Sequence, residues 1–233
     1  MAVSLELLKR NHYFAGVSQP EIETISPHVF EKTAAREQPI IFEGEPTSAL
    51  YFVVSGAVKV FKTSADGKEQ ILEIVLPGGS FNDAAVLVGG PNRYSAQAMG
   101  SVVLYGLPAN KLDAILRDYP RVARNVIRVL ANQLLHLTSL VEDLSFRTVS
   151  GRTARILLDY ATAGNTGGRP LTQREMAAMA GTAREVVGRS LKHLEDRGAI
   201  SINRHRIIIN DREALKKLAG TADETEVTDS QRL

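Results

Sequence analysis

The residues of this sequence best suited to chemistry are charged side chains that lie close together near residue 185. Arg184 and Arg189 stand five positions apart, and Glu185 lies between them. Arginine can bond to both O6 and N7 of guanine, and glutamate can accept a hydrogen bond from N4 of cytosine. We therefore expect these three side chains to read base edges in duplex DNA, if one helix presents them outward. A small helical domain that binds protein is the alternative interpretation.

Neighbouring positions add further candidates for contact with bases or phosphates. Gly188 is costly inside a helix, and close approach to a sugar–phosphate edge would explain its presence. A predicted hairpin after Gly198 has a basic tip that could touch phosphate. The complete expected DNA-binding set is Arg184, Glu185, Gly188, Arg189, Thr172, Gln173, Arg174, Thr182, Lys192, Arg204, His205 and Arg206.

Two capping boxes predict the helices that must position this set. Thr172 stands three residues before Glu175, and Thr182 stands three residues before Glu185. In a capping box the Thr hydroxyl accepts from the third backbone N–H, and the Glu reaches back to the Thr N–H. We therefore predict two short helices, each starting just after its Thr. Gly181 supplies the left-handed conformation that ends the first of them.

The segment around these helices is typical of a winged helix–turn–helix. Ala177 is small enough for the two helices to approach closely, and Val187 should face back into the same contact. An amphipathic helix over residues 154–163 is predicted before them. Strand patterns over residues 199–202 and 206–209 predict a β-hairpin wing after them.

A long helix with a regular apolar seam precedes this domain. Pro120 opens a stretch without internal Gly or Pro that runs to residue 146. Its apolar positions recur with a mean period of 3.5 residues, which favours a two-helix coiled coil and hence a homodimer. A helix packed only on its own domain is the alternative, but such a helix usually has a wider apolar face. The expected dimer interface is Ile127, Leu130, Leu134, Leu137, Val141 and Leu144.

The first half of the chain has the pattern of a small β-domain. Short strand-like runs are separated by Ser-Gly, Asp-Gly and Pro-Gly-Gly turns, which predicts an antiparallel barrel or jelly roll. Short helices are predicted before it, over residues 3–10 and 19–28. The predicted fold class is α+β. Its parts are an N-terminal antiparallel β jelly-roll barrel (1–119), a long dimerisation helix (120–147), a C-terminal winged helix-turn-helix (148–220) and an acidic tail (221–233).

Charge is distributed unevenly along the chain, although the net charge is only +2. Residues 1–147 hold 14 Lys/Arg and 15 Asp/Glu, whereas residues 148–220 hold 13 and 7, a balance of +6. A basic block in a near-neutral chain favours a polyanionic partner such as nucleic acid. Residues 221–233 hold one Arg and four acids without apolar periodicity, which predicts a disordered tail.

Composition and motifs exclude several classes of function. The 233 residues include no cysteine, which excludes disulfides, iron–sulfur clusters and cysteine nucleophiles. No GxSxG elbow, P-loop, HExxH or GxGxxG–helix motif occurs, so we do not expect an enzyme. A signal-binding adaptor is a further alternative, which the winged domain argues against. No apolar run approaches a bilayer span and no secretory signal is present, so we expect a cytoplasmic protein without a membrane partner.

In this order, the barrel, long helix and winged domain resemble the CRP/FNR family of bacterial transcription regulators. The similarity covers residues 10–215. It rests in the barrel on residues 42–45, 50–60 and 77–81, and in the DNA-binding domain on residues 151–152, 171–175, 184–189 and 191–198. The resemblance implies a homodimer that binds palindromes of TGTGA-type half-sites through Arg184, Glu185 and Arg189. RNA polymerase is a further candidate partner. Ala183 and Val186 stand where the cyclic-AMP-responsive branch has Ser and Thr, so two contacts of that branch differ here.

The resemblance also implies an effector site in the barrel, where this sequence departs from the cyclic-AMP-responsive branch. That branch uses a Glu for the ribose and an Arg for the phosphate, and the matching positions here are Ala84 and Tyr94. Asp83 would repel phosphate unless it caps a helix. Cyclic AMP is therefore not the expected effector. The expected effector residues are Asn82, Asp83, Ala84, Ala85, Arg93, Tyr94, Ser95, Leu137 and Thr138.

The chemical identity of the effector stays open between several candidates. Residues 91–98 resemble the nitric-oxide-responsive branch, which is thought to use haem, and the candidate haem ligands are His12, His28, His136 and Met99. His136 should point partly sideways toward the barrel. The remaining alternatives are a different small molecule, a cyclic nucleotide in an altered pocket, or no effector. Any effector signal would pass through the long helix and a short hinge over residues 146–151.

Overall fold

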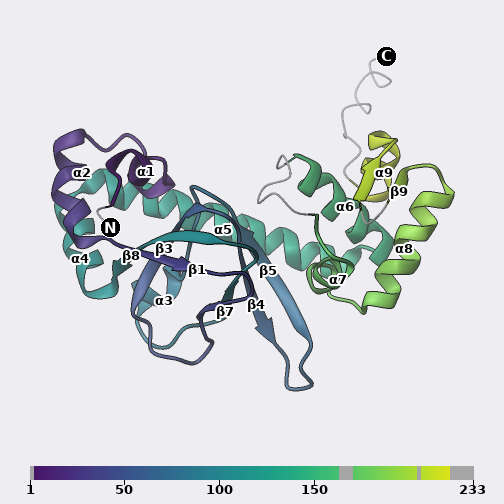
Figure 1. The fold of residues 1–233 in the computed structure, drawn as a ribbon, viewed down its shortest axis with the longest axis horizontal. Helices are drawn as coiled ribbons and strands as arrows, with labels where there is room; N and C mark the ends of the chain where they lie inside the picture. The colour runs from purple at the N-terminus through teal and green to yellow at the C-terminus, as the bar shows by residue number, and fades with distance from the viewer. Residues whose placement is uncertain (1–2, 163–169, 204–205, 221–233) are drawn as a thin grey trace, which may run out of the picture. The chain divides into compact units, whose positions relative to one another are not determined.

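The computed structural model describes residues 3–162, 170–203 and 206–220, which form two compact units (Figure 1). The first unit extends to Leu140, and the second begins at Val141. Helix α5 (Pro120–Phe146) is continuous across that boundary. The predicted acidic tail (221–233) and two residues of the predicted wing tip, Arg204 and His205, lie outside the described residues.

Two four-stranded antiparallel sheets form the first unit, in the orders β1-β8-β3-β6 and β2-β7-β4-β5. The strands are β1 (Phe30–Ala34), β2 (Pro39–Ile41), β3 (Ala49–Ser55), β4 (Val58–Thr63), β5 (Glu69–Val75), β6 (Ser80–Phe81), β7 (Ser95–Ala98) and β8 (Val102–Pro108). Both sheets contribute to one core, in which Tyr51 stacks on Phe81 and Val58 and Leu104 are fully buried. The predicted N-terminal antiparallel jelly-roll and the α+β class are confirmed.

Helices cover the outer face of the β1-β8-β3-β6 sheet (Figure 1). They are α1 (Leu5–Lys9), η1 (His12–Phe14), α2 (Gln19–Ile25), η2 (Ser26–His28), α4 (Ala109–Asp118) and the first turns of α5; α3 (Asp83–Val88) follows β6. Phe14, Phe52 and Tyr13 pack edge-on within this second core. Sequence reasoning missed β1, because its burial pattern does not alternate, and it missed the ten-residue helix α4.

Helix α5 has 27 residues and begins at the predicted proline. Val122 and Val126 in its first turns are buried against the first unit, and Leu130 is partly covered by the same core. Further along, Ile127, Leu134 and Val141 are about two-thirds exposed, at 67 %, 66 % and 63 %. The predicted helix is confirmed. Leu130 is less exposed than the other seam positions, because it also packs against the core of the first unit.

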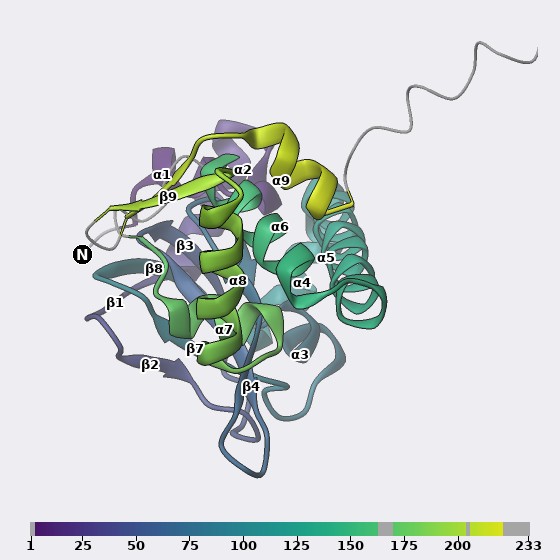
Figure 2. The same ribbon diagram turned by 90° about the vertical axis from the view of Figure 1, so that its right-hand side faces the viewer.

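The second unit is a helical domain with a two-stranded hairpin (Figure 2). Its elements are α6 (Val149–Thr162), α7 (Gln173–Ala180), α8 (Arg184–Asp196), β9 (Ile200–Asn203), β10 (Arg206–Ile209) and α9 (Arg212–Leu218). The helix predicted from residue 154 begins five residues earlier, at Val149. Helix α9 was not predicted, although the side chain of Asp211 accepts from Ala214 N and is a recognisable N-cap signal.

Candidate functional site

Helix α7 is held in place by the first predicted capping box. The Thr172 hydroxyl accepts from Glu175 N at 3.2 Å, and a Glu175 carboxylate oxygen accepts from Thr172 N at 2.8 Å. Gly181 ends the helix in the left-handed conformation, with φ 62° and ψ 41°. Ala177 and Val187 lie in one buried cluster, as predicted for a helix–turn–helix contact. Thr172 and the next two residues, Gln173 and Arg174, are exposed at the start of α7.

The second predicted capping box is wrong. Thr182 N donates to Ala177 O at 3.0 Å, so Thr182 belongs to the turn that closes α7. Helix α8 starts one residue later, with Ala183 as its N-cap and no side-chain capping bond. The left-handed conformation of Gly181 brings the backbone N–H of Thr182 to a carbonyl oxygen of α7. Thr182 is therefore not the N-cap of α8, which begins one position later.

Helix α8 has one buried face and one charged face. Val187, Leu191 and Leu194 are at most 1 % exposed and anchor the helix in its unit. The opposite side presents the expected base readers Arg184, Glu185 and Arg189, all exposed. Their spacing therefore places them together on the solvent side of a helix that is firmly packed on the other side. This is the arrangement that direct readout in a major groove requires.

The fold gives no internal reason for the glycine at position 188. A Cβ on Gly188 would meet only Gln173 Oε1 among the described residues, at an ordinary contact distance of 3.7 Å. Its backbone is helical, because α8 runs through it. An intramolecular clash therefore does not explain Gly188, whereas close approach of a ligand backbone would.

Replacing Gly188 with alanine should separate folding from DNA binding. We expect the free energy of unfolding to rise by about 0.5–1 kcal/mol, because alanine is favoured over glycine inside helices. We expect DNA binding to weaken by about 1–3 kcal/mol, the typical cost of an extra methyl in a closely packed contact. Thermal melts and fluorescence anisotropy measure the two effects. Gly100→Ala, where a Cβ meets nothing within 4 Å, is the matched control. Unchanged DNA affinity in Gly188→Ala would contradict this reading.

Two further residues of the expected DNA-binding set, Lys192 and Arg206, are exposed, but Lys192 already pairs with neighbouring carboxylates. Lys192 is exposed, but its Nζ lies 3.2 Å from Glu195 and 3.1 Å from Asp196. Hydrogen bonds to Asp196 and Glu195 raise the pKa of Lys192, because the two carboxylates stabilise its charged form. Arg206 is exposed on β10 of the hairpin, as predicted for the wing.

The expected effector residues Asn82 and Asp83 are buried, and their hydrogen bonds are mostly internal. Asn82 has a left-handed backbone, with φ 71°, and donates from Nδ2 to Ala49 O at 3.0 Å. Its Oδ1 has no hydrogen-bond partner among the described residues. The Asp83 carboxylate accepts from the Tyr13 hydroxyl, from Ser80 Oγ at 2.8 Å and from Gln133 Nε2 at 3.2 Å. Asp83 is the first residue of helix α3, and the N-cap residue before it, Asn82, makes no side-chain capping bond.

Burial controls the titration of this cluster. It raises the pKa of Asp83, and the hydrogen bonds from Tyr13, Ser80 and Gln133 oppose that shift. Burial also raises the pKa of Glu73, which the nearby His136 opposes. Sequence reasoning missed Tyr13, Ser80, Glu73 and Gln133, because they lie on four different elements and no short-range spacing connects them.

Tyr94 stands where the resemblance places a phosphate-binding arginine. Its hydroxyl accepts from Asn82 N at 2.5 Å, and burial raises its pKa. Arg93, one position earlier in the chain, is exposed. Ser95 Oγ accepts from Glu43 N at 3.1 Å. The side chains of this loop thus bond within the first unit or face solvent.

The remaining effector candidates are spread over separate elements. Ala84 is exposed and Ala85 buried on α3; on α5, Leu137 is exposed, and the Thr138 hydroxyl donates to Leu134 O. His136 Nε2 lies 3.0 Å from Leu72 O, which confirms its predicted direction toward the sheets.

The candidate haem ligands lie on separate elements of the first unit. His12 and His28 are exposed on η1 and η2, and Met99 is buried after β7. Among the described residues, no three His, Asp or Glu side chains lie close enough together to hold a metal ion. Within the same residues, no helix is both long and apolar enough to cross a bilayer.

Comparison with known proteins identifies both units. The cyclic nucleotide-binding domain family matches residues 31–119, and the Crp-like helix-turn-helix domain family matches residues 151–218. A CRP-like cAMP-activated global transcriptional regulator of Mycobacterium tuberculosis is 31 % identical over 221 residues, which cover 92 % of this chain and 99 % of that protein. The cyclic AMP receptor protein of Thermus thermophilus is 29 % identical over 212 residues, covering 91 % of this chain and 98 % of that protein.

A solved structure supports the same assignment. FixK2 of Bradyrhizobium japonicum superposes with a TM-score of 0.74 at 26 % identity, covering 84 % of this chain and 99 % of that chain. The first family match covers the sheet domain, and the second covers the helix–turn–helix. The chain therefore belongs to the CRP/FNR family of transcriptional regulators, with a cyclic nucleotide-binding-type domain and a Crp-like helix-turn-helix domain.

Proposed function

We propose that this protein is a homodimeric, sequence-specific DNA-binding regulator whose base readers are Arg184, Glu185 and Arg189. The observation that carries the proposal is helix α8. Its apolar face is fully buried, and it presents these three side chains together to solvent. A bidentate arginine on guanine supplies sequence discrimination, and the basic surroundings supply phosphate contacts. Thr172, Gln173, Arg174 and Arg206 would then position the unit on the backbone.

Dimerisation is proposed from the exposure of the α5 seam. The large apolar side chains of Ile127, Leu134, Leu137, Val141 and Leu144 are all exposed in the single chain. They recur at the 3.5-residue period along one helix, so a second copy of the helix could cover all of them at once. A palindromic site with half-sites one helical turn apart would match such a dimer.

We propose further that the effector is not cyclic AMP. The relatives in Mycobacterium tuberculosis and Thermus thermophilus carry names that refer to cyclic AMP, and the barrel belongs to the cyclic nucleotide-binding domain family. In this chain a ribose acceptor is absent at Ala84, and Tyr94 replaces the phosphate-binding arginine that the resemblance implies. Asp83 adds a buried carboxylate at the same turn, and burying a second anion beside it would be costly.

One titration tests both parts of the proposal. A fluorescent palindrome of TGTGA-type half-sites is titrated with protein, with and without cyclic AMP, at several salt concentrations. We expect binding that weakens by about a thousandfold or more between roughly 50 and 200 mM salt, because phosphate contacts release counterions. We expect cyclic AMP to leave the affinity unchanged. Absence of binding would refute the DNA-binding proposal, and a large response to cyclic AMP would refute the effector proposal.

A further inference from the structure

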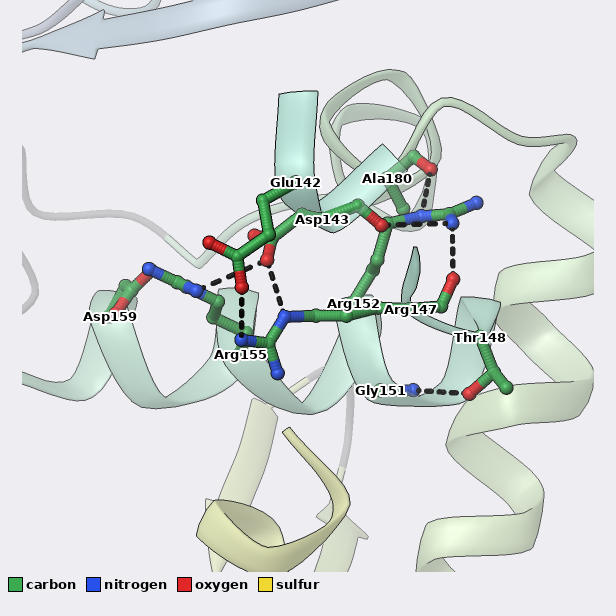
Figure 3. Close-up of polar contacts among 9 residues, drawn as sticks. All are labelled: Glu142, Asp143, Arg147, Thr148, Gly151, Arg152, Arg155, Asp159 and Ala180. Carbon is green, nitrogen blue, oxygen red and sulfur yellow. Dashed lines mark hydrogen bonds and ion pairs between the residues drawn. The ribbon is translucent and has the colours of Figure 1, made fainter. Parts of the chain in front are cut away.

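The junction between α5 and α6 contains a network of arginines and carboxylates, in which Asp143 is the carboxylate that bonds to two arginines (Figure 3). Arg147 Nε donates to Asp143 Oδ1 at 2.5 Å, and Arg155 Nη1 donates to the same oxygen at 3.1 Å. Asp143 lies in the last turn of α5, and Arg155 lies in the second turn of α6. The carboxylate of Asp143 therefore bridges two helices that only residues 147–148 separate.

This bridge is shielded from solvent. The side chains of Asp143, Arg147 and Arg155 are only 14 %, 16 % and 27 % exposed. Exposed ion pairs contribute little, but charge-assisted hydrogen bonds in a partly desolvated place are stronger, and the planar guanidinium also fixes direction. Two arginines on one oxygen thus restrain the angle between the end of α5 and α6.

A third arginine connects the same junction to the helix–turn–helix. Arg152 Nη1 donates to Arg147 O at 2.7 Å, and Arg152 Nε donates to Ala180 O at 2.8 Å (Figure 3). Ala180 is the last residue of α7, immediately before the left-handed Gly181. Through Arg152, the junction is therefore joined to the turn from which the recognition helix α8 starts.

We propose that Asp143 is a positioning residue that, together with Arg147 and Arg155, sets the distance between the two recognition helices of a dimer. The inference rests on the proposed function, because this distance matters only when two copies bind one duplex. If α5 is the shared rod of the dimer, its angle to α6 determines where each copy places α8. With a stiff junction the dimer would bind palindromes of one half-site spacing, and with a loosened junction it would bind palindromes of several spacings.

A series of palindromes that differ only in half-site spacing tests this role. Asp143→Asn removes the charge but keeps the shape of the side chain. We expect the wild-type protein to prefer one spacing strongly, and we expect Asp143→Asn to reduce that preference by about threefold to tenfold. Affinity for a duplex with a single half-site should not change, because α8 itself is untouched. Fluorescence anisotropy measures every duplex, and thermal melts check that the variant is folded.

Two further variants make the result specific. Arg155→Gln removes the α6 side of the bridge and should flatten the spacing preference in the same way. Asp159→Asn is the matched control, because Asp159 is 73 % exposed and lies 3.9 Å from Arg155 Nε on the same helix, so this pair does not bridge α5 and α6. It should keep the wild-type preference.

The possible outcomes separate this inference from the proposed function. If no form of the protein binds any palindrome, the proposed function fails and this inference fails with it. If wild-type protein binds but Asp143→Asn keeps the same spacing preference, the inference alone is refuted. A uniform loss of affinity at every spacing would also refute it, because that result indicates only a structural role.

Discussion

Replacing Leu134 with glutamate should convert the protein into a monomer and nearly abolish its binding to palindromic DNA. Leu134 lies in the middle of the seam and is 66 % exposed in the single chain. Covering a leucine by a partner helix contributes about 1.5–3 kcal/mol, whereas a buried, unpaired glutamate opposes the same contact. Each copy would then bind only one half-site.

The expected loss for this variant follows from linked binding. Joining two half-site contacts raises affinity by about a hundredfold to ten-thousandfold over one contact, and a monomer forfeits that gain. Sedimentation or light scattering measures the mass, and anisotropy compares a full palindrome with a single half-site. Leu135→Glu is the matched control, because Leu135 is 68 % exposed but lies outside the heptad seam. A Leu134→Glu protein that remains dimeric would contradict the proposed interface.

Replacing Arg184 with alanine should weaken specific binding by about 1–3 kcal/mol and relax the preference at one base pair of each half-site. Arg184 opens α8 and is exposed, so its removal leaves the buried face of that helix intact. Protein stability should therefore stay close to that of the wild type. Binding to the cognate palindrome and to variants at each position is measured by competition.

The matched control for this prediction is Arg197→Ala. Arg197 caps the opposite end of α8 and is also exposed, so its loss removes the same charge from the same helix. We expect this control to change affinity for all sequences by a similar factor, without altering base preference. If Arg184→Ala also weakens every sequence equally, Arg184 contacts only phosphate and is not a base reader.

Several elements were predictable because their signals are local. The box from Thr172 to Glu175, the left-handed Gly181 and the seam of α5 all depend on residues within a few positions of one another. Turns with glycine and short β-branched runs likewise defined most strands of the barrel. Capping, turn geometry and helix periodicity are set by such neighbours, and this is why the family resemblance could be identified from the chain alone.

The tertiary structure decided the features that join distant segments. Asp83 meets Tyr13 and Gln133, which are 70 and 50 residues away, and Asp143 meets Arg155 across a helix junction. Thr182 lies in the turn that ends α7 and is not the N-cap of α8, because its backbone N–H donates to Ala177 O. The sequence by itself thus determined the order of the barrel, the long helix and the helix–turn–helix, and the outward placement of Arg184, Glu185 and Arg189 on α8. The side chains that surround Asp83 and the arginines that bond to Asp143 depended on packing that brings distant positions together. No spacing rule describes such packing.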